Sequence, residues 1–245
     1  TATTEIYTLS LHDALRSLGR PVADWSPATM PDKSVLSGQH CRLEPLTLAH
    51  GKGLLAAFRA DDEGVIWDFL PYGPFDSWPA FEAFLEASCL ATDPFFYAII
   101  DSVSDQPVGM ASYLRITPAH GVIEVGHINF APALQRTPAA TEVMYLMMRQ
   151  VFDVWGYRRY EWKCNDLNNR SKQAAHRLGF SFEGVFQQAA VIKGHNRDTA
   201  WFPMLDSEWP AIKTGFERWL DVANFDETGK QRQSLMQLRD PGAAG

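Results

Sequence analysis

The sequence predicts an α+β protein, and three patterns along its 245 residues support this fold class. Short segments that alternate apolar and polar residues predict strands, and longer segments with apolar residues three or four positions apart predict helices. Three strand-like segments follow one another between residues 95 and 130 with hairpin-like connections, which predicts an antiparallel meander. A helical segment then separates two more strand-like segments, as in a crossover between parallel strands. We therefore expect a mixed, mostly antiparallel sheet flanked by helices.

The two ends of the chain are expected to differ from its middle. Residues 1–37 contain three prolines between short apolar pieces, which predicts an extended N-terminal arm whose Trp25 packs on the body of the protein. Regular patterning begins at Gly38, and we expect one folded domain over residues 38–220. Residues 221–245 are expected to form a polar C-terminal tail that frays at its end.

The first half of the domain combines two helices with the meander. A long loop over residues 61–77, rich in aromatic and turn residues, separates the two helices. The spacing of apolar residues predicts helices over 48–60 and 78–91, and strands over 41–46, 95–101, 108–116 and 122–130.

The second half begins with the crossover helix, expected over residues 139–155. Its buried stripe is predicted to consist of Val143, Met144, Met147, Val151 and Val154. The remaining pattern predicts strands over 158–164, 180–186 and 200–205, a polar turn over 193–198, and helices over 169–178 and 209–220.

Composition excludes several classes of protein. Twenty-nine acidic residues against 22 basic ones give a net charge of −7, which disfavours a nucleic-acid or anionic-membrane partner and favours a cationic one, such as an amine. The three cysteines are widely spaced, which predicts buried thiols in a reducing cytoplasm rather than disulfides or a metal site. No apolar run is long enough to span a membrane and no secretory signal is visible, so the predicted location is cytoplasmic.

The segment LQRTPAATE, residues 134–142, marks the start of the crossover helix. Thr137 is expected to cap this helix, and Pro138 falls at the first helical position, where a missing N–H costs no hydrogen bond. The backbone amides of the next three residues, Ala139, Ala140 and Thr141, would be free to bind an anion. Arg136 would add a positive charge beside them. A capped helix without a ligand is the competing interpretation.

The order of elements and several motifs together resemble the GNAT acetyltransferase superfamily, and specifically its RimJ/RimL-type branch, over residues 36–206. QRTPAATE is similar to the QxxGxG/A loop of that family, although Pro138 stands where the family has its first glycine. NNRSKQAAHRLGF (168–180) is similar to its NxxS helix ending in GF, and FEGVF (182–186) and NRDTAWF (196–202) follow. WDFLPYGPF, GYRRYEWKC and KGHNRDTAWF resemble one uncharacterised subgroup.

The resemblance implies the GNAT fold, in which the central strands splay apart and acetyl-CoA binds in the gap as co-substrate, without a metal. The gap would lie between the strands expected over 122–130 and 158–164, and the pyrophosphate would bind at the start of the crossover helix. By position, the implied cofactor-binding residues are Asn129, Phe130, Gln135, Arg136, Thr137, Ala139, Ala140, Thr141, Asn168 and Ser171.

Acetyl transfer to an amine needs a proton acceptor for the amine and benefits from an acid for the leaving thiolate. The resemblance implies that Ser171 protonates the CoA sulfur, whereas a local helix cap is the alternative role for Asn168 and Ser171. The base of some RimL-like proteins would fall at Ala190, so Glu124 is the expected replacement, with solvent exposure or an ion pair as its alternative. His127 could act as base or as one end of a water relay, or simply pack in its strand.

The acceptor site is expected at Trp67, Tyr72 and Asp198, with core packing and turn capping as their alternative roles. The predicted function is an N-acetyltransferase that acts on the primary amine of a small molecule or a peptide N-terminus by direct attack. The alternative is a catalytically inactive module that binds CoA or a protein, which Pro138 and Ala190 favour. Neither nucleic acid nor a membrane is an expected partner, and association into a homodimer is left open.

Overall fold

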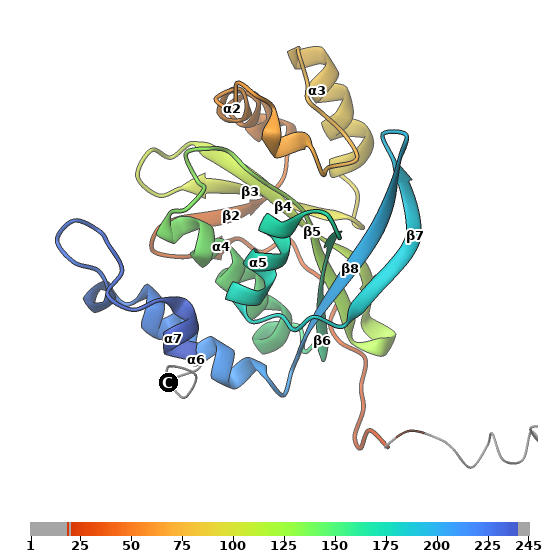
Figure 1. Ribbon diagram of the computed structural model, residues 1–245, viewed down its shortest axis with the longest axis vertical. Coiled ribbons are helices and arrows are strands. Elements are labelled where there is room, and N and C mark those ends of the chain that lie inside the picture. The colour runs from red at the N-terminus through yellow and green to blue at the C-terminus, as the bar shows by residue number, and fades with distance from the viewer. Residues whose placement is uncertain (1–18, 20, 240–245) are drawn as a thin grey trace, which may run out of the picture.

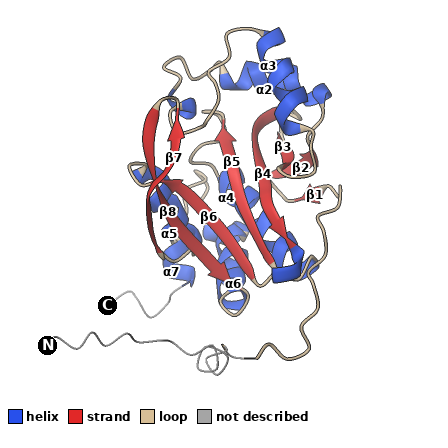
Figure 2. Cartoon of the chain, turned by 90° about the vertical axis from the view of Figure 1, so that its right-hand side faces the viewer, coloured by secondary structure: helices blue, strands red, loops and turns tan. Residues whose placement is uncertain are grey.

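The computed structural model describes residues 19 and 21–239, which form one eight-stranded sheet in the order β1-β2-β3-β4-β5-β6-β8-β7 (Figures 1 and 2). Neighbouring strands are antiparallel except β5 and β6, so the predicted mixed, mostly antiparallel sheet is confirmed. The strands are β1 (Leu36–Ser37), β2 (Cys41–Pro45), β3 (Phe95–Asp101), β4 (Pro107–Thr117), β5 (Val122–Phe130), β6 (Arg159–Asn165), β7 (Gly184–Ile192) and β8 (His195–Leu205).

Helices cover both faces of the sheet because the side chains of the inner strands alternate between two cores. In β3, Tyr97 and Ile99 belong to the core beneath α4 and α6, whereas Phe96 and Ile100 belong to the core beneath α2. The helices are α2 (Leu48–Phe58), α3 (Trp78–Phe84), α4 (Pro138–Arg149), α5 (Asn169–Leu178), α6 (Trp209–Leu220) and α7 (Leu235–Arg239).

The crossover helix differs from its prediction at its C-terminal end. α4 starts at Pro138 and ends at Arg149, and a π-helical turn, Gln150–Val154, follows it. A π turn adds a residue to the helical repeat and rotates the side chains that follow. Val154, which we expected in the buried stripe, is consequently 58% exposed, whereas Val143, Met144, Met147 and Val151 are buried as predicted.

The C-terminal hairpin corrects two predicted boundaries. We expected a strand over 180–186, but β7 starts at Gly184 and extends to Ile192. We also expected a polar turn over 193–198, but the turn contains only Lys193 and Gly194, both at positive φ. Two such residues make a tight hairpin whose twist matches the strands, so the polar residues after them continue as β8.

The ends of the described chain contact the body. The Arg158 guanidinium lies 5.7 Å from the Trp25 ring centroid, in agreement with the expected packing of Trp25. Within the predicted tail, α7 packs against α5 and α6, and Leu235 is fully buried. Residues 1–18, 20 and 240–245, including the end expected to fray, lie outside the described residues.

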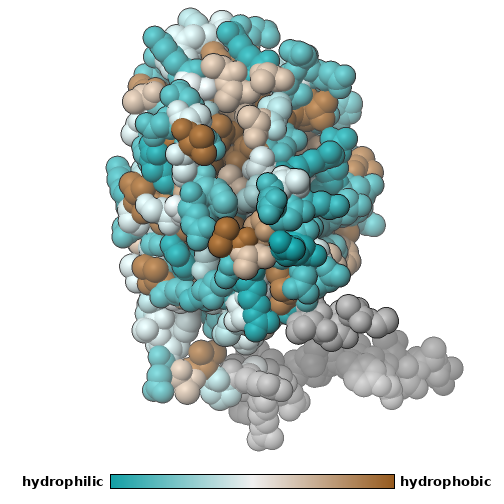
Figure 3. Space-filling model, turned by 90° about the vertical axis from the view of Figure 1, so that its left-hand side faces the viewer, coloured by the Kyte–Doolittle hydropathy of each residue, from teal (hydrophilic) through white to brown (hydrophobic). Residues whose placement is uncertain are grey.

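The surface and composition of the described residues add three observations. On the face drawn in Figure 3, hydrophobic residues lie mostly singly among hydrophilic ones. No helix within residues 19 and 21–239 is long and apolar enough to cross a membrane. The same residues contain no cluster of three side chains that could hold a metal ion, and the three cysteines are free and buried.

The central parallel pair separates after four residues, which creates the gap needed for a site. β5 pairs with β6 only from Val122 to Val125, opposite Arg159 to Trp162. Further along β5, the register with β4 shifts and His127 adopts a φ of 51°. This bulge bends β5 away from β6, so the predicted splay of the central strands is present.

Candidate functional site

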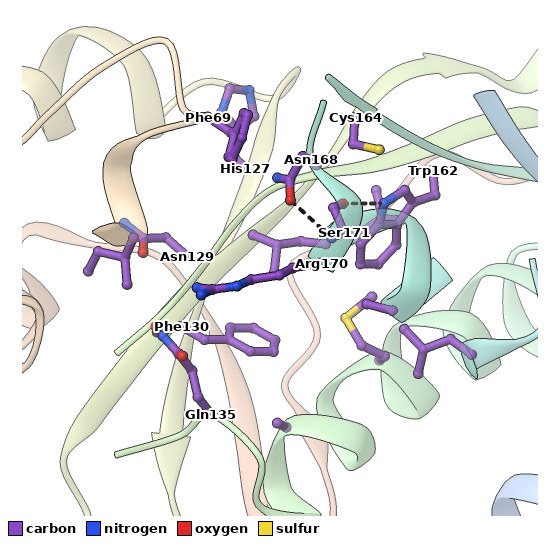
Figure 4. A pocket seen from close by; sticks show the side chains of 18 of the residues that line it. Phe69, His127, Asn129, Phe130, Gln135, Trp162, Cys164, Asn168, Arg170 and Ser171 are labelled. Carbon is purple, nitrogen blue, oxygen red and sulfur yellow. Dashed lines mark hydrogen bonds between the residues drawn. The ribbon is translucent and has the colours of Figure 1, made fainter. Parts of the chain in front are cut away.

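A cavity of about 1550 Å³ opens where β5 and β6 part. One part, which we call the helix end, is lined by residues 135–144, by α5 and by residues 219–231. The other part, the strand end, is lined by the loop 61–71 and by residues of β5, β6, β7 and β8. In Figure 4, the Arg170 side chain extends across the gap from Ser171 toward Phe130.

The first turn of α4 forms part of the helix end. Thr137 caps the helix as predicted, because its Oγ1 accepts a hydrogen bond from the Ala140 amide at 3.2 Å. The Ala140 amide is therefore already paired, contrary to the expectation that three successive amides are free. Ala139 is 7% exposed and belongs to the core, whereas Ala140 and Thr141 line the cavity.

The loop before α4 places two further predicted residues at the cavity. Gln135 and Arg136 are exposed on its wall, and Arg136 has a φ of 61°. The Gln135 side-chain amide donates to the Phe130 carbonyl at 2.9 Å, which ties the loop to the end of β5. The Arg136 charge can therefore meet an anion in front of the α4 start.

Positive charge dominates the helix end. Four of the side chains that line it are cationic, namely Arg136, Arg170, Arg177 and Lys230. No carboxylate lines the helix end among the described residues. Arg177 donates to Thr141 Oγ1 at 3.1 Å and lies 5.3 Å from the Trp219 ring centroid, and it pairs with no carboxylate in the described chain. Burial lowers the pKa of Arg177 from its usual value, because the charged guanidinium loses hydration. The favourable interaction with a bound anion would offset this loss of hydration.

The start of α5 orients Ser171 toward the gap. The Asn168 side chain caps the helix by accepting from the Ser171 amide at 3.0 Å, as the alternative interpretation proposed. Ser171 Oγ accepts from the Trp162 indole N–H at 3.0 Å (Figure 4). An indole can only donate, so the Ser171 hydroxyl keeps its own proton for another acceptor.

The bulge in β5 brings His127 to the strand end. Its Nδ1 lies 3.2 Å from the Tyr72 hydroxyl, and the two rings stack with centroids 5.6 Å apart. Burial, together with the nearby charge of Arg197, lowers the pKa of His127 to about 4. The imidazole is therefore neutral near pH 7 and can accept a proton or a hydrogen bond.

Asn129 is the most unusual polar residue of the gap. Its side chain is 1% exposed, and neither its amide nitrogen nor its oxygen has a hydrogen-bond partner among the described residues. Unpaired buried polar atoms are rare and costly in native proteins. Asn129 and the neighbouring Phe130 line the cavity, so a ligand in the gap can pair with this amide.

Glu124 lines the cavity and is ion-paired at the same time. Its Oε2 lies 2.7 Å from Lys163 Nζ and 3.4 Å from Arg115 Nε. Lys163 also contacts Glu161 at 2.8 Å, so the charges alternate across the sheet. Burial raises the pKa of Glu124 although Lys163 opposes this shift. The ion-pair alternative for Glu124 is therefore realised.

The expected acceptor residues lie elsewhere. Trp67 is 4% exposed and packs edge-on against Phe58 in the core beneath α2, with ring centroids 5.2 Å apart. Tyr72 lies behind His127 and does not line the cavity. The Asp198 carboxylate faces the β7 bulge and accepts from the Gln188 amide at 2.7 Å. The alternative role of Trp67, core packing, describes its position. The turn-capping alternative for Asp198 does not, because Asp198 lies within β8 and binds the β7 bulge instead of the hairpin turn.

Sequence reasoning missed several residues of the cavity wall. Arg197 and Trp201 face the cavity because they alternate with Asp198 along β8, a signal that the strand pattern could have provided. Trp162 and Lys163 of β6 also line the cavity, and neither was among the residues expected there. Residues 219–231 reach the cavity through tertiary packing alone.

Comparison with known proteins identifies the domain. Residues 40–181, more than half of the chain, match the family model described as "Acetyltransferase (GNAT) domain". A solved structure of a GCN5-related N-acetyltransferase from Brucella melitensis is 45% identical, with a TM-score of 0.88, and the match covers 89% of this chain and 100% of that one. A probable GNAT-family acetyltransferase from Chromobacterium violaceum is 41% identical, with a TM-score of 0.73 and coverage of 79% and 96%.

More distant comparisons establish only the fold. The ribosomal L7/L12 alpha-N-protein acetyltransferase RimL is 17% identical, with a TM-score of 0.62 and coverage of 70% of this chain and 94% of that one. The search among curated proteins finds no match. The family model and the two closer structures nevertheless agree with the splayed sheet and its cavity, and the chain belongs to the GNAT acetyltransferase family.

Proposed function

We propose that the protein transfers the acetyl group of acetyl-CoA to a primary amine by direct attack, as a RimJ/RimL-type N-acetyltransferase. The supporting observation is that one cavity joins a cationic helix end to a strand end that holds a neutral imidazole. The first part suits a polyanionic co-substrate, and the second suits an acceptor amine that must lose a proton.

The helix end fits the phosphate groups of acetyl-CoA. Arg136, Arg177 and Lys230 are its candidate phosphate ligands, together with the first turn of α4. Pro138 replaces a family glycine, but it occupies the first helical position, where no N–H is lost from the helix ladder. In the gap, the unpaired Asn129 amide offers a donor and an acceptor to the pantetheine or to the thioester carbonyl.

Acetyl-CoA supplies the carbonyl carbon that the amine attacks and the thiolate that leaves. The Ser171 hydroxyl, held by the Trp162 indole, donates its proton toward the sulfur and so stabilises the thiolate. His127 receives the proton that the amine loses as the new C–N bond forms, directly or through water. Both side chains act without a covalent intermediate on the protein.

The low pKa of His127 favours one kind of amine. A group with a pKa of about 4 cannot deprotonate a free ammonium, so the acceptor must lose its ammonium proton to solvent before it attacks. At pH 7, about a tenth of α-amino groups are neutral, against about 4 in 10,000 lysine side chains. We therefore propose an α-amine, such as a peptide N-terminus, as the acceptor.

Two measurements test this function. Calorimetry with acetyl-CoA should show binding, and release of free thiol should require an added amine. A panel of peptides that differ in whether the α-amine or only a lysine amine is available should show faster release with the α-amine. Binding without release for every acceptor would favour the inactive module, and absence of binding would contradict both.

A further inference from the structure

The strand end contains one cation, Arg197, that contacts no carboxylate among the described residues. Arg197, Thr199 and Trp201 of β8 face the cavity, and Arg197 lies opposite Ala190 of β7. Lys163 and Arg115, the other cations of the strand end, both contact the Glu124 carboxylate. Arg197 contacts no carboxylate within 4 Å in the described part of the chain.

Two donors on this face of β8 have no acceptor within the described part of the chain. Arg197 Nε and Trp201 Nε1 are buried, and neither has a hydrogen-bond partner among the described residues. Guanidinium and indole groups can only donate, so no rearrangement between them satisfies either one. A ligand that pairs with them must therefore carry hydrogen-bond acceptors, such as the oxygens of a carboxylate.

The surroundings limit the charge of such a ligand. Asp61, Glu63 and Glu124 also line the strand end, and they oppose a ligand with several negative charges. The same carboxylates attract the protonated form of an approaching amine. The planar guanidinium of Arg197 matches the two oxygens of a carboxylate.

We propose that the acceptor carries a carboxylate in addition to its amine and that Arg197 binds this carboxylate. This inference rests on the proposed function, because it places the carboxylate beside the attacking amine. The carboxylate can come from an acidic side chain next to a peptide N-terminus or from a free amino acid. Arg197 is a binding residue, and its bound anion orients the amine toward the gap.

The test compares acceptors that are matched in size and differ in one carboxylate. Each kcat/KM is calculated per unit concentration of the neutral amine, because a nearby carboxylate also raises the pKa of the α-amine. Amidated Glu-Ala-Phe is paired with amidated Gln-Ala-Phe, and L-phenylalanine is paired with L-phenylalaninamide. We expect kcat/KM to be about tenfold or more higher for the charged member of at least one pair. The first pair detects a side-chain carboxylate on a peptide, and the second detects a free amino acid.

Three variants assign the preference to its residue. Arg197→Gln should reduce the ratio within the preferred pair to within about twofold of one, mainly through KM, and Arg197→Lys should keep part of it. Arg158→Gln is the matched control, because Arg158 is exposed, lies on Trp25 and does not line the cavity. Calorimetry of the same pairs with CoA-saturated protein measures binding independently of turnover.

The outcomes separate this inference from the proposed function. Turnover without any preference for charge overturns the inference and leaves the acetyltransferase standing. A preference that survives in Arg197→Gln also overturns it. Charge-selective binding that is lost in Arg197→Gln, without turnover, supports the inference and contradicts the proposed function. Failure of every pair to bind and to react overturns the inference.

Discussion

The two ends of the cavity differ in the charges of the side chains that line them. At the helix end, the lining side chains include cations and no carboxylate within the described residues, and Arg177 has no acidic partner there. At the strand end, positive and negative side chains alternate, and Glu124 pairs with both Lys163 and Arg115. The helix end therefore carries a net positive field, whereas the strand end has as many carboxylates as cations, although Arg197 contacts none of them within the described residues.

This difference in charge indicates that one end binds a polyanion and that the other positions the reacting groups. A field of one sign binds a polyanion strongly and with little demand on its orientation, and such binding weakens as salt increases. A balanced site gains little from net charge and acts through position and proton state, as the neutral His127 illustrates. Variants of the helix end should therefore change the affinity for acetyl-CoA, whereas variants of the strand end should leave that affinity unchanged and change turnover or acceptor binding.

The largest effect is expected from His127→Gln. Loss of a general base typically lowers a rate by about 10² to 10⁴. We expect turnover to fall by at least about a hundredfold, while the affinity for acetyl-CoA stays unchanged, because His127 lies at the strand end. Thiol release and calorimetry on the same preparation measure the two quantities.

Tyr72→Phe is the control for this change, because it removes the hydroxyl beside His127 Nδ1 but keeps the stacked ring. It should reduce turnover less than His127→Gln does. If His127→Gln weakened acetyl-CoA binding as strongly as it slows turnover, the division between the two ends would be wrong.

The second effect tests the helix end. Ala140→Asp places a carboxylate on the cavity wall at the start of α4. Two like charges 4 Å apart repel by about 4 kcal/mol at an effective dielectric constant of 20, so acetyl-CoA affinity should fall about a hundredfold or more. Ala140→Asn, of nearly the same size but neutral, should retain most of the affinity. Equal affinities for the two variants, measured by calorimetry, would contradict a phosphate site here.

Arg177→Gln should have a smaller and more selective effect. Arg177 lies between Thr141 and Trp219, at the part of the helix end formed by residues 219–231. If it binds the 3′-phosphate, the variant should lose about tenfold or more in affinity for acetyl-CoA and little for acetyl-3′-dephospho-CoA. Calorimetry with both compounds at two salt concentrations provides the measurement. An equal loss of affinity for the two compounds would indicate that Arg177 binds the pyrophosphate or only stabilises the fold.

The helix end was more predictable from the sequence than the strand end. Thr137 and Pro138 mark the start of α4 through local chemistry, because a cap and a first-turn proline act within a few residues. The paired Ala140 amide follows from the same cap, yet we counted it as free. Arg177 and Lys230 meet only in the folded chain, so no local pattern indicates their shared cavity.

The strand end depends on long-range packing, and its predictions were correspondingly less accurate. His127 and Glu124 line the cavity as expected. The ion pairs of Glu124 join three strands, so the sequence could not show whether Glu124 is free to act as a base. Asp198 was chosen because it matches an acidic position in RimL-like proteins, although alternation along β8 directs Arg197 to the cavity and Asp198 to the β7 bulge. Trp67 lies in a loop whose side chains divide between core and cavity, a division set by tertiary structure.

The smallest change in turnover is expected from Glu124→Gln, and its pH dependence has a definite sign. Burial raises the pKa of Glu124, so at pH values below that pKa the natural protein also carries a neutral carboxyl and resembles the variant. Any loss must therefore grow as pH rises through this pKa. We expect less than about a tenfold loss at high pH, well below the roughly 10² to 10⁴ of a lost general base, because Glu124 positions Lys163 and does not itself accept the proton. A pH series of thiol release for both proteins measures this ratio. A loss of about a hundredfold or more at high pH, with His127→Gln nearly as active as the natural protein, would reverse the assignment and make Glu124 the base.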